Sequence, residues 1–449
     1  MSTDDTLLVS VSGIRGVVGR GLTPEKACAF AAALGTFLEG GRVVLSRDGR
    51  SSGEALRHAA LAGLLGTGCD VLDIGVAPTP TCGLAVRHLQ AAGGLQITAS
   101  HNPAEWNGLK MFGPDGAVLS AADGRKVREL FEEGRMKYAP WDGVGALQVP
   151  PDPGEEHLRR ACDQVSVAAI HASRFRVFLD ANGGAGGPLA VRLLRELGCE
   201  VIEYACNADG RFEHEPEPIP AHLADVAPLV RRAGAAVGFV LDPDADRLAL
   251  IDENGECLSE ELTLALAVRH RLGQQPGPVV VNMSTSRAVE DIAAEAGGTC
   301  ERSAVGEANV VARMREVGAV LGGEGNGGVI DPRVGWVRDP FVGMAMILDL
   351  LAAQSRSLSE IVASLPRYAM VKAKAPVPRE RLADGLAALR RQWPDARANE
   401  LDGLRLDWPD RWVHVRPSNT EPVVRVIAEA PEADQAEALS REAASLLAG

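Results

Sequence analysis

The sequence predicts an α/β protein of several units, the last of which is organised differently from the others. At 449 residues the chain is too long for one hydrophobic core, because domains typically hold about 150 residues. Short β-branched runs alternate with helical patterns along most of the chain, which is typical of parallel sheets covered by helices. Near the C-terminus, strand-like runs are grouped ahead of a single helix, which indicates an α+β unit.

The first alternation lies between residues 42 and 98. Strands are expected at 42–46, 69–74 and 94–98, and helices at 53–65 and 79–89. The strand segments are rich in valine, leucine and isoleucine, and the helical segments place small and apolar residues on one face. We expect a first domain over residues 1–152, because the Pro-Pro-Asp-Pro-Gly run at 150–154 can continue neither a helix nor a strand ladder.

The alternation restarts twice after this linker. Strands are expected at 174–179, 235–241, 279–282 and 320–322, and helices at 188–197 and 286–296. The C-terminal unit has expected strands at 412–415 and 423–427 and a helix at 433–447. The chain therefore divides into three α/β domains followed by one α+β domain. The predicted domains after the first are 153–253, 254–366 and 367–449.

Composition limits the partners of the protein. Lys and Arg total 46 against 60 Asp and Glu, and the net charge of -14 disfavours nucleic acid and anionic membranes, which require basic surfaces. No apolar stretch approaches the about 20 residues needed to span a bilayer, and the acidic N-terminus does not resemble a signal peptide. The eight cysteines are scattered without zinc or redox spacing. We predict a cytoplasmic monomer or homodimer that binds a small molecule.

A cluster of carboxylates follows the apolar run 236–240. Asp242, Asp244 and Asp246 alternate at the end of an expected buried strand, so they can converge on one hard cation such as Mg²⁺ or Ca²⁺. An EF-hand loop begins similarly, but it needs glycine where this chain has Arg247, and it lies between helices. A solvated acidic turn is the other alternative. We predict a divalent-cation site.

A second motif, Gln-Ile-Thr-Ala-Ser-His-Asn-Pro at 96–103, is an expected strand that runs into a turn closed by proline. Ser100 lies just past the carboxyl end of this strand, where an α/β protein can present a nucleophile. Adjacent residues of an extended segment point to opposite faces, so we do not expect Ser100 to pass its proton directly to His101. Taken alone, the motif fits a simple turn equally well.

Two further loops offer polar groups. Residues 416–422 read Arg-Pro-Ser-Asn-Thr-Glu-Pro, with Arg425 beyond, and can form an anion cradle, although a polar hairpin turn is the alternative. Residues 322–328 are rich in glycine, which permits close backbone approach, and their Glu and Asn side chains could bind sugar hydroxyls. The glycine-rich run 182–187 lacks a phosphate-binding signature and is predicted to be a tight turn. Residues 13–16 and 107–110 each offer a cation in an expected turn.

Together these motifs resemble the α-D-phosphohexomutases, the family of phosphoglucomutases, phosphomannomutases and phosphoglucosamine mutases. The resemblance covers essentially the whole chain, with the motifs in the family's order. Residues 98–103 look like the phosphoserine loop, 242–247 the metal loop, 323–328 the sugar loop and 416–422 the phosphate loop. The resemblance implies four domains around a central cleft: three related mixed α/β domains and a C-terminal α+β domain.

The resemblance also implies a reaction, the interconversion of hexose 6-phosphate and hexose 1-phosphate through a 1,6-bisphosphate. Ser100 would carry the phosphoryl group, one oxygen of which would complete the Mg²⁺ site of the three aspartates, and a hexose 1,6-bisphosphate would be the activator. The implied catalytic residues are Ser100, Lys110, Arg15 and Arg247, and the implied substrate-binding residues are His101, Glu324, Asn326, Arg416, Ser418, Asn419, Thr420 and Arg425. Lys110 is a candidate for proton transfer if neighbouring cations lower its pKa.

One departure concerns the sugar loop. Many relatives read Gly-Glu-x-Ser-Gly-His there, whereas this chain has Asn326 and Gly328 in place of the Ser and the His. No catalytic histidine is carried over, and the general base is left open. The Glu-Gly-Asn-Gly-Gly form resembles phosphoglucosamine mutase-like members from archaea and some bacteria, which favours glucosamine 6-phosphate over glucose and mannose phosphates. A sugar-phosphate sensor without turnover and a Mg²⁺-dependent sugar phosphatase are the alternatives.

Overall fold

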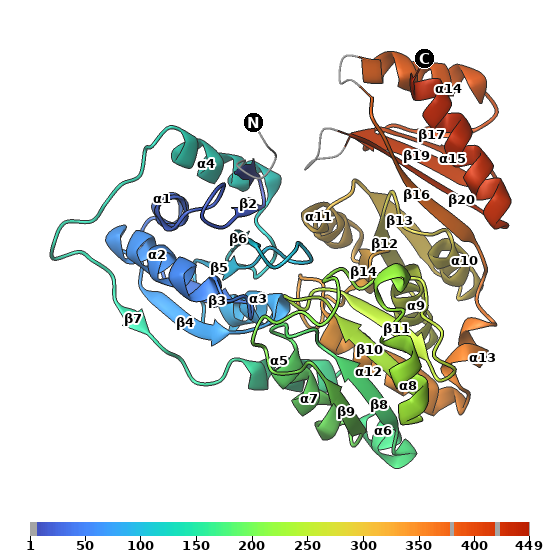
Figure 1. Ribbon diagram of the computed structural model, residues 1–449, viewed down its shortest axis with the longest axis horizontal. Coiled ribbons are helices and arrows are strands. Elements are labelled where there is room, and N and C mark those ends of the chain that lie inside the picture. Colours follow the sequence, from blue (N-terminus) through green and yellow to red (C-terminus); the bar gives the residue numbers. More distant parts are fainter. Residues whose placement is uncertain (1–6, 378–380, 418–422, 449) are drawn as a thin grey trace. The chain divides into compact units, whose positions relative to one another are not determined.

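The computed structural model, drawn in Figure 1, describes residues 7–377, 381–417 and 423–448. The chain divides into two compact units. Unit 1 comprises Met1–Arg271 and Asn326–Ala363, and unit 2 comprises Leu272–Gly325 and Ser364–Gly449. Helices and sheets alternate through both units, so the predicted α/β class is confirmed. The four domain boundaries expected from the sequence stay a prediction.

Unit 1 begins with a seven-stranded mixed sheet of order β1-β2-β6-β5-β3-β4-β7. Its strands are β1 (Leu8–Ser10), β2 (Gly13–Val17), β3 (Val43–Arg47), β4 (Val71–Val76), β5 (Gly93–Ile97), β6 (Trp106–Phe112) and β7 (Leu147–Gln148). The helices are α1 (Pro24–Phe37), α2 (Gly53–Gly66), α3 (Thr79–His88) and α4 (Ala121–Glu132). Strands β4, β3 and β5 are parallel, as the expected alternation requires.

The segments 13–16 and 107–110 were expected as turns, and that expectation is wrong. They belong to β2 and β6, which pair antiparallel with Gly13 opposite Lys110 and Arg15 opposite Gly108. Their glycines are required by close packing: a Cβ on Gly108 would lie 2.5 Å from the Ile14 carbonyl oxygen and 2.7 Å from that of Thr98. Pairing therefore places Arg15 and Lys110 on neighbouring strands.

A second sheet of unit 1 has the order β11-β10-β8-β9. Its strands are β8 (Arg176–Asp180), β9 (Glu200–Tyr204), β10 (Val237–Leu241) and β11 (Leu248–Asp252), accompanied by α5 (Gly154–Cys162), α6 (Val167–Ser173), α7 (Gly187–Glu196) and α8 (Ala227–Ala233). The central strand β10 is buried along its whole length. It pairs parallel with β8 and antiparallel with β11, so the loop between β10 and β11 is a short reversal at the sheet edge.

The rest of unit 1 consists of β15 (Gly328–Ile330), α12 (Pro340–Gln354), α13 (Leu358–Val362) and most of α9 (Glu261–Gln274). Helix α12 is almost entirely apolar and buried through Leu351, which makes it a core helix. Asp339 caps its N-terminus by accepting hydrogen bonds from the backbone N–H groups of Phe341 and Val342, and Pro340 occupies the first turn.

Unit 2 contains a parallel ladder and an antiparallel sheet. The ladder consists of β12 (Pro278–Asn282), β13 (Thr299–Ser303) and β14 (Leu321–Glu324), with α10 (Ala288–Glu295) and α11 (Glu307–Val317). The antiparallel sheet has the order β16 (Ala369–Ala375), β20 (Val424–Ala430), β19 (Trp412–Pro417), β18 (Leu404–Asp407) and β17 (Arg397–Asn399), with α14 (Leu382–Gln392) and α15 (Ala433–Ala448). The expected C-terminal α+β unit is thus present. Across the described residues, no helix has the length and apolar character needed to cross a membrane.

His414 is a fully buried titratable group of unit 2. Its Nε2–H donates to the Asp402 carbonyl oxygen at 2.6 Å, which leaves Nδ1 to accept from the Ser284 hydroxyl at 3.0 Å. Burial lowers the pKa of His414 to about 4, with Arg405 and Arg416 acting in the same direction and the bond to Asp402 opposing them. The folded protein therefore holds a neutral imidazole at this position.

We expect unit 2 to lose stability as pH falls from about 6.5 toward 4. In that interval the unfolded chain protonates His414 and the folded chain does not, so stability is complete only above the unfolded pKa. The shift corresponds to about 3 kcal/mol. The measurement is the change in urea-unfolding midpoint between pH 7.5 and pH 5. His414→Gln should reduce this change, whereas His58→Gln, at an exposed histidine, should not. An unaltered pH dependence in His414→Gln would contradict this explanation.

Candidate active site

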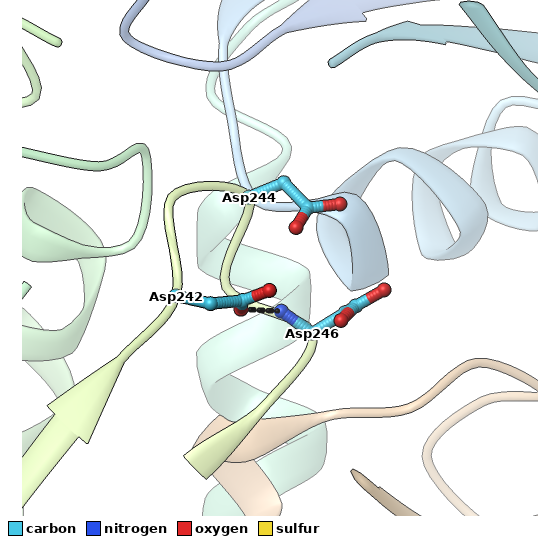
Figure 2. Close-up of side chains that lie close together, drawn as sticks. All are labelled: Asp242, Asp244 and Asp246. Atoms are coloured by element: carbon cyan, nitrogen blue, oxygen red, sulfur yellow. Dashed lines mark hydrogen bonds between the residues drawn. The ribbon is translucent and has the colours of Figure 1, made fainter. Parts of the chain in front are cut away.

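The three aspartates of the β10–β11 loop converge as expected. Their side chains are fully buried, and one oxygen from each lies within 4.8 Å of the others. Figure 2 shows the side chains leaving one short loop toward the same side, with Asp242 accepting a hydrogen bond from the backbone N–H of Asp246 at 3.0 Å. Ala245 has a φ of +51°, and this left-handed residue turns the chain so that Asp246 returns beside Asp242.

In two of these carboxylates, one oxygen accepts hydrogen bonds and the other does not. Asp244 Oδ2 accepts from the Thr79 hydroxyl at 2.6 Å and from Lys110 Nζ at 3.2 Å. Asp246 Oδ2 accepts from Lys110 Nζ at 2.8 Å and from Arg338 Nη2 at 2.6 Å. Within the described part of the chain, Asp244 Oδ1 and Asp246 Oδ1 are buried and have no hydrogen-bond partner.

A buried carboxylate oxygen without a donor carries an uncompensated desolvation cost, so such oxygens indicate a missing partner. The donor set is oxygen only, which suits a hard divalent cation such as Mg²⁺ rather than a softer metal. The residues present therefore fit the cation expected from the sequence.

The pKa values of Asp242 and Asp246 shift in opposite directions. Burial, together with the charges of Asp244 and Asp246, raises the pKa of Asp242 well above its ordinary value. Burial also acts to raise the pKa of Asp246, but the cations Arg338 and Lys110 lower it below the ordinary value. The difference follows from geometry, because Asp246 accepts hydrogen bonds from two cationic side chains. A divalent cation would favour the charged form of all three.

Ser100 lies beside this cluster, with its hydroxyl oxygen 3.2 Å from Asp242 Oδ2. The same oxygen is 3.3 Å from His101 Nδ1, so the expectation that the two side chains point to opposite faces is wrong. Ser100 has a φ of +51° and is left-handed rather than extended, which brings the hydroxyl and the imidazole to one side. A non-glycine residue in this region costs about 1 kcal/mol or more, so the surroundings must hold it there.

Arg50, which the sequence reasoning missed, holds the loop that carries Ser100. It is buried, and its two terminal nitrogens donate to the backbone carbonyls of Ser100, Asn102, Pro103 and Trp106 at 2.6–3.0 Å. Its Nε donates to Asp48 Oδ2 at 3.1 Å, and the same oxygen accepts from the Thr98 hydroxyl at 2.7 Å. The sequence did offer one indication of this contact. Residues 48–50 follow β3 and the serine loop follows β5, and these two parallel neighbours end at the same edge of the sheet.

The other expected cations lie around the same loop. Arg15 Nη1 donates to Asn102 Oδ1 at 3.3 Å, and Arg247 Nη1 donates to Glu217 Oε1 at 3.1 Å. Burial, followed by the charge of Arg247, lowers the pKa of Arg15 from its ordinary value. Lys110 Nζ lies 3.2 Å from Asp244 Oδ2 and 2.8 Å from Asp246 Oδ2, so it contacts two carboxylates, and its role in proton transfer stays a prediction.

His101 is placed between Ser100 and a carboxylate. Its Nε2 lies 3.8 Å from Glu217 Oε1. Burial lowers the pKa of His101 well below the ordinary value, and Arg247 adds to the effect. Glu217, Thr79 and Arg338 were not foreseen, since each reaches the site from a segment without a local motif. Only the Arg-Asp-Pro run at 338–340, a typical helix start, offered a sequence signal for its segment.

Most of the remaining expected residues belong to unit 2. Glu324 ends β14, and its Oε1 accepts from Asn282 Nδ2 at 2.8 Å and from the Gly306 N–H at 3.1 Å. Asn326 belongs to unit 1. Residues Ser418, Asn419 and Thr420 lie outside the described residues.

Three cations form a row across the C-terminal sheet. Arg416 on β19 lies directly opposite Arg425 on β20, which in turn lies opposite Lys374 on β16. Directly opposite residues of antiparallel strands share a face, so the three side chains extend from one side of the sheet. Arg416 Nε donates to Asp402 Oδ2 at 2.9 Å. Lys374 was not foreseen, because strand register is what places it in the row.

Comparison with known proteins agrees with this geometry. The chain matches four descriptions in order: phosphoglucomutase/phosphomannomutase alpha/beta/alpha domain I at residues 7–137, domain II at 155–255, domain III at 260–368, and the C-terminal domain at 373–446.

Similar full-length relatives come from archaea. A protein named probable phosphoglucosamine mutase from Methanopyrus kandleri is 38% identical over 96% of this chain and 95% of its own length. A phosphoglucomutase/phosphomannomutase from Thermococcus kodakarensis is 37% identical, with 96% of each chain covered. The crystal structure of a family protein from Burkholderia thailandensis superposes with a TM-score of 0.85 at 28% identity, covering 97% of this chain and 96% of the other. The chain therefore belongs to the phosphoglucomutase/phosphomannomutase family, the α-D-phosphohexomutases, and is a hexose-phosphate mutase.

Proposed function

We propose that this mutase carries the migrating phosphoryl group on Ser100 and that its preferred substrate pair is glucosamine 6-phosphate and glucosamine 1-phosphate. The observation that carries the proposal is the 3.2 Å distance between the Ser100 hydroxyl and Asp242, within a buried cluster of three carboxylates. The choice of sugar rests on the Glu-Gly-Asn-Gly-Gly loop and on relatives named for glucosamine, and glucose and mannose phosphates are the alternatives.

In the proposed reaction, a free hydroxyl of a hexose monophosphate loses its proton and forms a bond to phosphorus as the bond between that phosphorus and the Ser100 oxygen breaks. The released Ser100 oxygen takes up a proton and becomes a hydroxyl again. The sugar then carries two phosphates, and the other one returns to Ser100. Asp242, Asp244 and Asp246 would hold Mg²⁺, which when bound offsets negative charge on the transferring group. Lys110 fixes one oxygen of Asp244 and one of Asp246, and Arg50 holds the serine loop.

The phosphate that is not transferring needs a separate anchor, and we propose the row of Lys374, Arg425 and Arg416. Like charges directly opposite each other on a sheet repel, and an anion bound on this face would reduce that repulsion. Guanidinium groups bind phosphate through paired donors, and Asp402 orients one of them by holding Arg416 Nε. Ser418, Asn419 and Thr420 are proposed to contribute hydroxyl and amide groups.

The proposed reaction also predicts the activator. A hexose 1,6-bisphosphate would leave one phosphoryl group on Ser100 and so prime the enzyme. His101, Glu324 and Asn326 are proposed substrate contacts, and Arg15 and Arg247 proposed cations of the transfer end. A cytoplasmic location stays a prediction.

Incubation with ³²P-labelled glucosamine 1,6-bisphosphate and Mg²⁺ should place label on the protein, because Ser100 is the proposed acceptor. Ser100→Ala should remove the label and reduce mutase turnover to background. Ser173→Ala, at an exposed serine of α6, should leave both unchanged. Label that persists at the wild-type level in Ser100→Ala would refute the assignment of the phosphoryl carrier.

Mg²⁺ should raise the thermal midpoint of the wild-type protein by binding its folded state. Asp244→Asn removes a ligand charge and should abolish most of this shift along with label transfer, and EDTA should abolish transfer by the wild type. Asp142→Asn, in an exposed loop, is the matched control and should respond to Mg²⁺ as the wild type does. An equal Mg²⁺ shift in Asp244→Asn would argue against a cation at the triad.

Arg50→Lys should slow label transfer about 10–100-fold, because an ammonium cannot reach the four carbonyls that the guanidinium spans. Unmade bonds to buried carbonyls should also lower stability by about 2–4 kcal/mol. Stopped-flow labelling and urea unfolding measure the two effects. Arg42→Lys, whose guanidinium bonds an exposed carbonyl, is the control and should retain wild-type values. Wild-type labelling rates in Arg50→Lys would exclude the proposed role of the brace.

A further inference from the structure

Gly328, the first residue of β15, is a glycine for lack of space. A Cβ built on it would lie 2.3 Å from Arg338 Cδ and 2.9 Å from Arg338 Cγ, distances that real Cβ atoms do not reach. Its backbone is not left-handed, so the conformation itself would tolerate other residues. The middle of the Arg338 side chain therefore lies where a side chain at position 328 would begin.

The backbone at Arg338 cannot shift easily, because the next residue, Asp339, is held by contacts of its N–H group and of both its carboxylate oxygens. The Asp339 N–H donates to the Val329 carbonyl at 2.7 Å, which fixes this segment beside β15. Asp339 Oδ1 caps α12, and Asp339 Oδ2 lies 2.9 Å from Nε2 of the fully buried His157. A shift of the backbone at Arg338 would therefore disturb a helix cap and a buried hydrogen bond of the next residue.

The head of Arg338 ends at the proposed cation site. Its Nη2 donates to Asp246 Oδ2 at 2.6 Å, with the arginine side chain only 10% exposed and the aspartate fully buried. Lys110 shares that oxygen, so Asp246 is held by one oxygen while its Oδ1 has no hydrogen-bond partner in the described part of the chain. An arginine at this place supplies a fixed charge and fixed geometry but cannot accept or release a proton in a protein.

We propose that Arg338 is a positioning residue of the phosphotransfer site, reaching across Gly328 to hold Asp246 by one oxygen and keep the other aimed at the cation site. The inference rests on the proposed function, in which Asp246 is a ligand of that site. In this arrangement Gly328 leaves room for the Arg338 side chain. Because an arginine does not exchange protons, Arg338 does not accept the proton that leaves the attacking hydroxyl.

A double-mutant cycle with Gly328→Ala and Arg338→Ala tests this coupling. Arg338→Ala should lower kcat about 10–100-fold, the usual range for groups that orient metal ligands, with KM for glucosamine 6-phosphate changed less than about threefold. Gly328→Ala retains every charge and mainly displaces Arg338, since the next nearest atom to its Cβ is Asn326 Oδ1 at 3.0 Å. It should lower kcat about tenfold. When Arg338→Ala is already present, the added methyl should have no further effect, and Arg338→Lys should recover part of the loss.

The thermal midpoint in EDTA provides a readout that does not depend on activity. Gly328→Ala should lower this midpoint when residue 338 is arginine and leave it unchanged when residue 338 is alanine. Arg333→Ala is the matched control, since Arg333 lies on the same segment, is 39% exposed and pairs with Asp331. It should retain kcat within about twofold.

Additive effects of the two substitutions on kcat would overturn the coupling. Coupling in the thermal midpoint with wild-type kcat in Arg338→Ala would also overturn the proposal, because it would leave Arg338 a purely structural role. A wild-type protein without mutase turnover would refute the proposed function itself, and the midpoint cycle would still show whether Arg338 and Gly328 share their space.

Discussion

Burial of three carboxylates in one loop is the constraint around which the site of unit 1 is built. Asp242, Asp244 and Asp246 are fully buried within a few ångströms of one another, an arrangement that costs free energy unless positive groups compensate it. Donors converge on it from every neighbouring element: a backbone turn at Asp242, Thr79 at the start of α3, Lys110 on β6 and Arg338 before α12. Elements far apart in sequence are thus tied to one short loop.

The serine loop is held by a buried ion pair, in which Arg50 binds the loop and Asp48 compensates its charge. Arg50 distributes its donors over four backbone carbonyls of the segment that carries Ser100. Burial raises the pKa of Asp48 while Arg50 and Thr98 act against that rise, so the pair is interdependent. A rigid support of this kind suits Ser100, whose left-handed backbone would otherwise relax.

The sequence was sufficient wherever the chemistry is local. The acidic loop, the serine turn and the βαβ alternation are contiguous patterns, and the structure has all three where they were expected. The sequence prediction was wrong where strand pairing determines the structure. The glycines at 13 and 108 are typical of turns, but they lie in the paired strands β2 and β6. The same limit explains why Thr79, Arg338 and Lys374 were missed, because register and packing bring them to their sites.

The error at His101 has another cause. Alternation of side chains holds only for extended backbone, and one residue with positive φ reverses it. No residue-type signal marks Ser100 as left-handed, since serine rarely adopts that conformation. Such local strain becomes visible only when the surrounding hydrogen bonds are known.

The row of Lys374, Arg425 and Arg416 has a consequence for selectivity. As the proposed anchor of a phosphate, this row would recognise charge and would take no account of the sugar ring that bears the phosphate. Either end of a doubly phosphorylated hexose could therefore occupy it with equal ease. A mutase whose bisphosphate must bind in two opposite orientations would benefit from a site that binds either phosphate equally well. Selectivity between sugars would then have to come from other residues.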